Sequence, residues 1–235
     1  ASRRNVDLLQ ELHADFGIRV TGDNKDVARE ADILFLAVKP HLYDSVIKEV
    51  RDVVKAEAII VNIAAGVSLS DIAESFGKPV KVVRAMPNTP AAVGEGMVAL
   101  CFSEGLSKDE QEEMVALFGS LGKAEIVEER LFDAVIGVSG SSPALLFMVI
   151  EAMADAVVKA GMPRAQAYQF AAQAMLGSAK MVLESGAHPG ALKDAVCSPG
   201  GTTIEMVVKA EEAGLRNAVI QAVEAAVAKS IEMNG

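Results

Sequence analysis

Residues 33–38, ILFLAV, decide the fold of the N-terminal half of this chain. An unbroken apolar run of this length is typical of a strand that is buried on both faces of a parallel sheet. A second such run, AIIVNIA at 58–64, follows a segment with helical spacing at 42–54. Strands that alternate with helices predict a doubly wound parallel sheet.

The alternation continues on both sides of this run. The spacing of apolar residues predicts further strands at 18–21, 80–85, 97–102 and 124–127 and helices at 6–16, 24–30, 69–76 and 108–121. From residue 128 onward we find only helical patterns, at 129–138, 143–160, 163–185, 190–196, 203–212 and 215–233. We therefore expect a Rossmann-like α/β dinucleotide-binding domain over 1–127 and an all-α domain over 128–235.

Composition narrows the class of protein. The chain has 235 residues, of which 51% are hydrophobic and 23% charged, as in a globular protein. The net charge of -10 argues against a nucleic-acid partner. We find no run that approaches the roughly 18 apolar residues of a membrane span, and no signal peptide, so we expect a cytoplasmic enzyme without a membrane partner. Isolated histidines and two distant cysteines predict no metal site.

Three sequences follow predicted strands at what would be one edge of the sheet. They are AVKP at 37–40, AAG at 64–66 and MPNTP at 86–90. Ligands of doubly wound sheets bind outside the carboxyl ends of the strands, so these turns predict a nucleotide site. The alternative is that Gly and Pro are ordinary turn residues and that Lys39 is a surface charge.

The start of the chain bears on the cofactor. No GxGxxG turn, which normally receives a pyrophosphate, occurs in the sequence. The chain opens with Ser2, Arg3 and Arg4 and then a helix, the order expected just after the second strand of a dinucleotide domain. We therefore expect that the first strand, the first helix and most of the second strand are missing. Arginines at this place favour the 2′-phosphate of NADP, with a solvated basic terminus as the alternative.

Residues 188–209, HPGALKDAVCSPGGTTIEMVVK, predict a second binding element in the helical half. Pro199, Gly200 and Gly201 require a turn between two helices. Thr202, followed by Glu205, has the pattern of a capping box with Thr202 as the N-cap. A helix N-terminus approached through glycines offers free N–H groups to a small carboxylate or phosphate, although an ordinary corner between helices has the same sequence pattern.

The helical half also predicts self-association. The segment 143–160 is apolar almost all round, and the last helix carries an apolar stripe of Ala and Val. One small helical domain cannot cover both, so we expect a second subunit to do so. The alternative is a monomer that packs these helices against its own sheet.

Three motifs together resemble the pyrroline-5-carboxylate reductase family: VCSPGGTT preceded by HPGALKD, MPNTP, and SGSSPA at 139–144. The resemblance implies reduction of 1-pyrroline-5-carboxylate to L-proline by NADPH, or less preferably NADH, and an interlocked homodimer that extends to a ring of dimers. It also implies a substrate site with Thr203 as the catalytic residue, formed by Ser198, Gly200, Gly201, Thr202 and Thr203. The cofactor would be held by Ser2, Arg3, Arg4, Asn24, Ala37, Val38, Lys39, Pro40, Ala64, Ala65, Gly66, Asn88, Thr89 and Pro90.

Two alternatives remain at the level of sequence. A related imine or 2-hydroxy acid reductase would share the sheet but lack the SPGGTT turn. A helical oligomerisation protein with an inactive nucleotide domain would have the same helices but no enzymatic activity.

Overall fold

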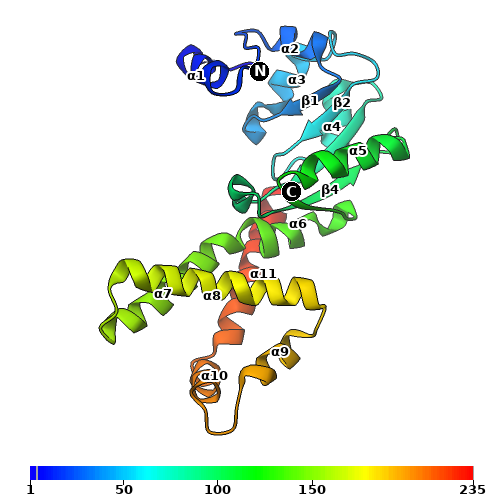
Figure 1. Cartoon of the computed structure of the whole chain (residues 1–235). Helices are drawn as coiled ribbons and strands as arrows, with labels where there is room; N and C mark the ends of the chain where they lie inside the picture. Colours follow the sequence, from blue (N-terminus) through cyan, green and yellow to red (C-terminus); the bar gives the residue numbers. More distant parts are fainter. Residues whose placement is uncertain (4, 235) are drawn as a thin grey trace. The chain divides into compact units, whose positions relative to one another are not determined.

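The computed structural model describes residues 1–3 and 5–234 (Figure 1). The predicted cofactor residue Arg4 therefore lies outside the described residues. The chain divides into two compact units: unit 1 comprises 1–140 and 227–235, and unit 2 comprises 141–226. The domain boundary that we predict at residue 128 lies inside unit 1, and it stays a prediction about domain organisation.

Unit 1 is built on a five-stranded sheet in the order β1-β2-β3-β4-β5. The strands are β1 (Ile33–Leu36), β2 (Ile59–Asn62), β3 (Lys81–Met86), β4 (Gly96–Phe102) and β5 (Gly122–Ile126). β1, β2 and β3 are parallel, as the apolar runs predict. Their register pairs Leu36 with Asn62 and Asn62 with Arg84, so their carboxyl ends meet at one edge.

Two details of the sheet differ from the expectation. β4 is antiparallel to β3, because only a short 3-10 turn, η2 (Thr89–Val93), joins them, and a parallel return needs a crossover of a dozen or more residues. The strand expected at 18–21 is also wrong. This segment forms a single parallel bridge, between Ser2 and Thr21, and one paired residue does not make a strand.

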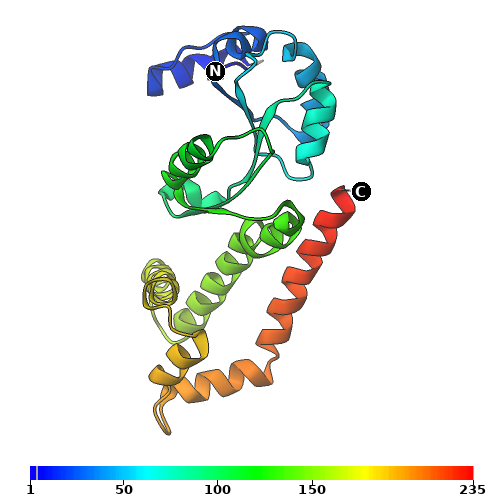
Figure 2. The same ribbon diagram turned by 90° about the vertical axis from the view of Figure 1, so that its right-hand side faces the viewer.

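Helices cover both faces of the sheet, which Figure 2 shows from the side. One core cluster lies between the sheet and α2 (Asn24–Glu30), α3 (Tyr43–Val50) and α4 (Leu69–Phe76). The other lies under α5 (Lys108–Gly119). Helix α1 (Val6–Phe16) precedes these elements. Capping boxes at Ser68 and Ser107 fix where α4 and α5 begin.

The last part of unit 1 follows β5 and is helical but irregular. It consists of η3 (Glu129–Leu131), α6 (Phe132–Val135) and a π-helical turn, η4 (Ile136–Gly140). Single π turns are frequent near functional sites. The sequence predicts one regular helix here and gives no sign of this change in pitch.

Unit 2 is entirely helical among its described residues. Its helices are α7 (Ser142–Lys159), α8 (Arg164–Ser185), α9 (Pro189–Val196), α10 (Thr202–Glu212) and the first part of α11 (Leu215–Asn234). α7 and α8 pack against each other. Large apolar side chains nevertheless stay exposed, among them Phe147 at 64%, Met148 at 65% and Phe170 at 62%. Phe147 and Met148 lie in the segment 143–160 that the sequence assigns to a second subunit, whereas Phe170 on α8 is not part of that prediction.

One helical run corrects the expectation about membrane-spanning length. The segment Glu129–Lys159 is long and apolar enough, by length and composition alone, to cross a membrane, with a mean hydropathy of 1.6 over its most apolar window. Length and composition are weak grounds for a membrane helix, because the core helix of a soluble protein can share them.

Candidate functional site

The parallel strands bring the three predicted cofactor turns to one edge of unit 1. Ala37–Pro40 follows β1, Ala64–Gly66 follows β2, and Asn88–Pro90 follows β3. Ala37, Lys39 and Pro40 are exposed, and Gly66 has a φ of 77°, a left-handed conformation that favours glycine. The edge therefore offers backbone and small side chains, which suit close approach by a nucleotide.

A buried polar network fixes the first two turns to each other. The Tyr43 hydroxyl donates to the Leu36 carbonyl oxygen at 2.5 Å and lies 2.8 Å from Oδ1 of Asn62. The same Oδ1 accepts from the Ala64 N–H at 2.8 Å, and Nδ2 of Asn62 donates to the Val67 carbonyl oxygen. Burial raises the pKa of Tyr43 to about 12. The sequence analysis missed both residues, although a single Asn in the apolar run AIIVNIA is a signal of this kind.

Asn88 is tied into the surrounding structure through both ends of its amide. Oδ1 accepts from the Met97 N–H at 2.9 Å, and Nδ2 lies 3.3 Å and 3.2 Å from the carbonyl and hydroxyl oxygens of Ser139. This residue therefore fastens the turn after β3 to β4 and to η4. Thr89 beside it is exposed and free of such bonds among the described contacts.

Ser2 and Asn24, which are both predicted cofactor residues, lie side by side. Oγ of Ser2 donates to Oδ1 of Asn24 at 2.7 Å, and Nδ2 of Asn24 donates to Glu49 at 3.0 Å. Arg3 is exposed. A cavity of about 340 Å³ is lined by Ser2, Asn24, Ala37 and Val38 together with the residues of β1. The structure thus brings together predicted cofactor residues that are far apart in the sequence.

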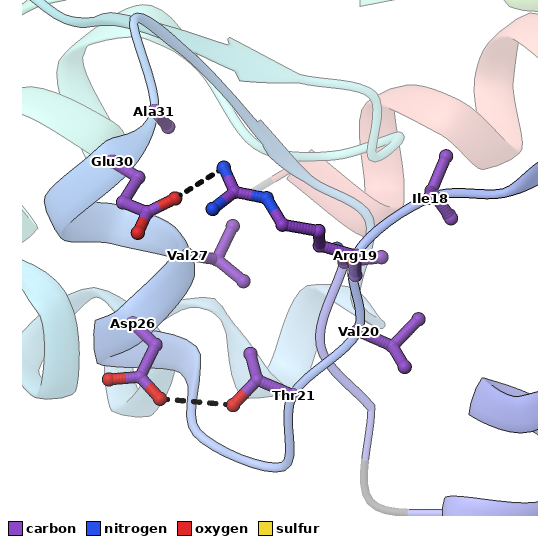
Figure 3. Close-up of a pocket in the computed structure, with 9 residues that line it drawn as sticks. Ile18, Arg19, Val20, Thr21, Asp26, Val27, Glu30 and Ala31 are labelled. Carbon is purple, nitrogen blue, oxygen red and sulfur yellow. Dashed lines mark hydrogen bonds and ion pairs between the residues drawn. The ribbon is translucent and has the colours of Figure 1, made fainter. Parts of the chain in front are cut away.

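A larger cavity of about 480 Å³ is less suitable for a phosphate (Figure 3). Two acidic side chains from α2 line it, and both already have partners. Arg19 pairs with Glu30 at 2.6 Å, and the Thr21 hydroxyl donates to Asp26 at 3.0 Å. Because two carboxylates line this cavity and its one arginine is already paired with Glu30, we place no cofactor phosphate here.

The predicted substrate turn lies in unit 2 between α9 and α10. The Gly201 N–H donates to the Ser198 carbonyl oxygen at 3.0 Å, and Gly200 has a φ of 66°. Pro199 and Gly200 at the two central positions are typical of a type II turn. Gly201 is extended, but a Cβ added there would lie 2.5 Å from Oγ of Ser198. A side chain at position 201 would therefore force the Ser198 hydroxyl to move.

The prediction that Thr202 caps the helix is wrong. The N-cap is Gly201, and Thr202 is the first residue of α10, with no side-chain cap recorded in the described part of the chain. The turn comprises Ser198 to Gly201, so α10 begins at Thr202, one residue earlier than predicted. The first N–H groups of α10, from Thr202 and Thr203, have no partner within the helix. An uncapped helix N-terminus is suited to an anionic ligand.

Comparison with known proteins places this geometry in a family. The model for pyrroline-5-carboxylate reductase dimerisation matches residues 129–233, and the model for NADP oxidoreductase coenzyme F420-dependent proteins matches residues 1–66. The pyrroline-5-carboxylate reductase of Escherichia coli is 50% identical over 97% of this chain and 85% of its own. The solved structure of a pyrroline-5-carboxylate reductase from Coxiella burnetii matches this chain with a TM-score of 0.92 and 33% sequence identity. The match covers 100% of this chain and 87% of the Coxiella burnetii chain.

A second solved structure bears on the cofactor. The Plasmodium falciparum pyrroline carboxylate reductase, which has NADP bound, matches with a TM-score of 0.85 and 31% identity over 93% of this chain and 83% of its own. Sequence identity and the shared fold agree over nearly the whole chain, and the two family models match residues 1–66 and 129–233. The chain belongs to the pyrroline-5-carboxylate reductase family.

Proposed function

We propose that this protein reduces 1-pyrroline-5-carboxylate to L-proline with NADPH, and with NADH less effectively. The observation that carries the proposal is the uncapped N-terminus of α10, which the Ser198–Gly201 turn leaves open to a small anionic ligand. Family membership supplies the reaction. A bound nicotinamide supplies the hydride that reduces the ring C=N bond, and solvent or a side chain supplies the proton.

The α10 turn supports the roles of the substrate residues. The N–H groups of Thr202 and Thr203 would hold the substrate carboxylate, assisted by the Ser198 hydroxyl and the open backbone at Gly200 and Gly201. The Gly201 N–H is already used in the turn, so its role is to leave space. The half-buried Thr203 hydroxyl would hydrogen-bond the ring nitrogen and act as the catalytic residue.

The edge of unit 1 supports the roles of the cofactor residues. The cavity lined by Ser2, Asn24, Ala37 and Val38 would take the ribose and phosphates, with Arg3 beside it for the 2′-phosphate. Lys39, Pro40 and Ala64–Gly66 would border the phosphates, while Thr89 and Pro90 would orient the nicotinamide. Asn88 would act indirectly, because its amide already holds the turn in place.

Self-association follows from the exposed apolar surface of unit 2. We propose an interlocked homodimer through residues 128–235, assembled further into a ring of dimers, in the cytoplasm. The exposed Phe147, Met148 and Phe170 support this, since a second copy would remove them from water at about 25 cal/mol per Å². The apolar helix α7 (Ser142–Lys159) then belongs to a protein interface.

The decisive experiment compares two threonines of the same turn. Thr203→Val removes the proposed catalytic hydroxyl, whereas Thr202→Val is a matched control because only the Thr202 N–H has a proposed role. NADPH oxidation is followed with 1-pyrroline-5-carboxylate, and 2-oxo acids serve as alternative substrates. We expect the Thr203 variant alone to lose activity. Preference for a 2-oxo acid, or no turnover of either substrate by the unaltered protein, would refute the proposed function.

A further inference from the structure

Glu129 connects three elements of unit 1 through one carboxylate oxygen. Its Oε1 accepts from Nη1 of Arg84 at 2.9 Å and from the Leu69 N–H at 2.8 Å. Arg84 lies on β3 just before the turn at 86–90, and Leu69 begins α4 just after the turn at 64–66. A single side chain therefore links two of the three turns at the cofactor edge.

The Arg84 side chain is held on several sides. It is only 7% exposed, and its guanidinium carbon lies 4.4 Å from the centre of the Phe132 ring. Nε of Arg84 is buried and has no hydrogen-bond partner among the described residues. An arginine stays charged, so burial makes Glu129 its necessary counter-ion. Apolar side chains of similar volume can stabilise a fold as well as a buried ion pair does. The reason for an ion pair at this place is therefore sought in what Arg84 and Glu129 hold in position.

Residues 129–140, which we call the clamp segment, also lie against the turn at 86–90. Ser139 of this segment meets the Asn88 amide, and a Cβ added at Gly140 would lie 3.4 Å from Cε of Met86. The clamp segment thus contacts Asn88 of the turn at 86–90, lies close to Met86 at the start of that turn and, through Glu129, reaches the start of α4. It begins where the match to the dimerisation family begins.

We propose that Glu129 is a positioning residue for the nicotinamide cofactor. It fixes the spacing between the turns at 64–66 and 86–90, so that phosphates and nicotinamide are received together. This inference rests on the proposed function, because it takes these turns as the cofactor site. Through Glu129 the start of the dimerisation region controls cofactor affinity.

The test uses the full chain and a control at the other end of β3. Glu129→Leu removes both hydrogen bonds, whereas Glu129→Gln keeps an oxygen that can accept both and removes only the negative charge. Glu110 is the matched control, because it pairs with Lys81 of β3 at 2.7 Å and accepts from the Ser107 N–H at 2.8 Å, away from the turns. The dissociation constant for NADPH is measured by calorimetry, and thermal unfolding is measured in parallel.

We expect Glu129→Leu to raise the dissociation constant about ten-fold and Glu129→Gln to restore it to within about three-fold. Glu110→Leu should lower thermal stability comparably and leave NADPH binding unchanged. If Glu129→Leu does not fold, Arg84→Lys replaces it, because lysine keeps the charge but loses the reach and the stacking. Equal NADPH affinity in the Glu129 and Glu110 variants at equal loss of stability would overturn the proposal.

Amide hydrogen exchange separates this inference from the proposed function. Glu129→Leu should speed exchange in 64–69 and 86–97, and Glu110→Leu should not. If the unaltered protein neither binds NADPH nor reduces the imine, the proposed function fails, and the exchange result alone decides whether Glu129 holds the turns. Unchanged exchange in both segments would overturn the clamp whatever the activity.

Discussion

Gly201→Ala tests the turn at the start of α10 most directly. The added Cβ would lie 2.5 Å from Oγ of Ser198 and 3.2 Å from its carbonyl oxygen, against ordinary contacts above 3.4 Å. The hydroxyl must therefore leave its place by about an ångström, with a rotamer change or overpacking that costs about 1–2 kcal/mol of folding free energy.

Gly201→Ala should reduce kcat/KM far more than it reduces the free energy of unfolding. Displacement of a substrate-binding group by about 1 Å costs roughly a hundred-fold in rate, so kcat/KM for the imine should fall by about that factor. Gly214→Ala is the control, since Gly214 lies outside the proposed substrate site, a Cβ there meets nothing within 4 Å, and its φ of 76° is strained for alanine. It should lose about 1 kcal/mol of stability with little loss of kcat/KM.

Steady-state kinetics and chemical denaturation of both variants provide the measurement. The reasoning predicts similar stability losses and different activities. Gly201→Ala with kcat/KM near that of the unaltered protein, or two variants whose activities fall equally, would show that the turn is only a corner between helices.

The other predictions concern separate parts of the molecule. Tyr43→Phe should cost about 1–2 kcal/mol of stability at neutral pH, because it removes a buried hydrogen bond to Leu36 and Asn62. The raised pKa of Tyr43 means that unfolded tyrosine ionises above pH 10 while the folded one stays neutral to about 12, so unfolding free energy should fall with rising pH in this window. The slope should be about 1.4 kcal/mol per pH unit and absent from Tyr43→Phe, as denaturation at each pH will show. Thr203→Val should reduce kcat by about ten-fold to a hundred-fold, and Thr203→Ser should recover it; activity of the Val variant near that of the unaltered protein would remove the hydroxyl from the reaction. Phe170→Glu should dissociate the oligomer in light scattering, whereas Lys180→Glu on the same helix should not; an unchanged mass for Phe170→Glu would place the interface elsewhere. Arg3→Gln should raise KM for NADPH about ten-fold and leave that for NADH unchanged; equal changes would show that Arg3 does not contact the 2′-phosphate.

The sequence by itself determined the elements and the family. The runs ILFLAV and AIIVNIA predict β1 and β2 because a strand covered by helices on both faces can only be apolar. Helix starts at α4 and α5 follow from Ser caps, whose side chains satisfy backbone groups within the same turn. The motifs MPNTP and SPGGTT are local as well. In each case the cause lies within a few residues, so the pattern is visible in the sequence.

Only the tertiary structure decided how those elements are joined into sites. The direction of β4 depends on the short link after β3, and the start of α10 at Thr202 depends on the turn that the Gly201 N–H closes onto the Ser198 carbonyl oxygen. Tyr43 meets Asn62, and Glu129 meets Arg84 and Leu69, across separations that no spacing pattern records. A buried polar group needs a partner, but periodicity shows only that a residue is buried. Which partner it finds is set by the register of the strands.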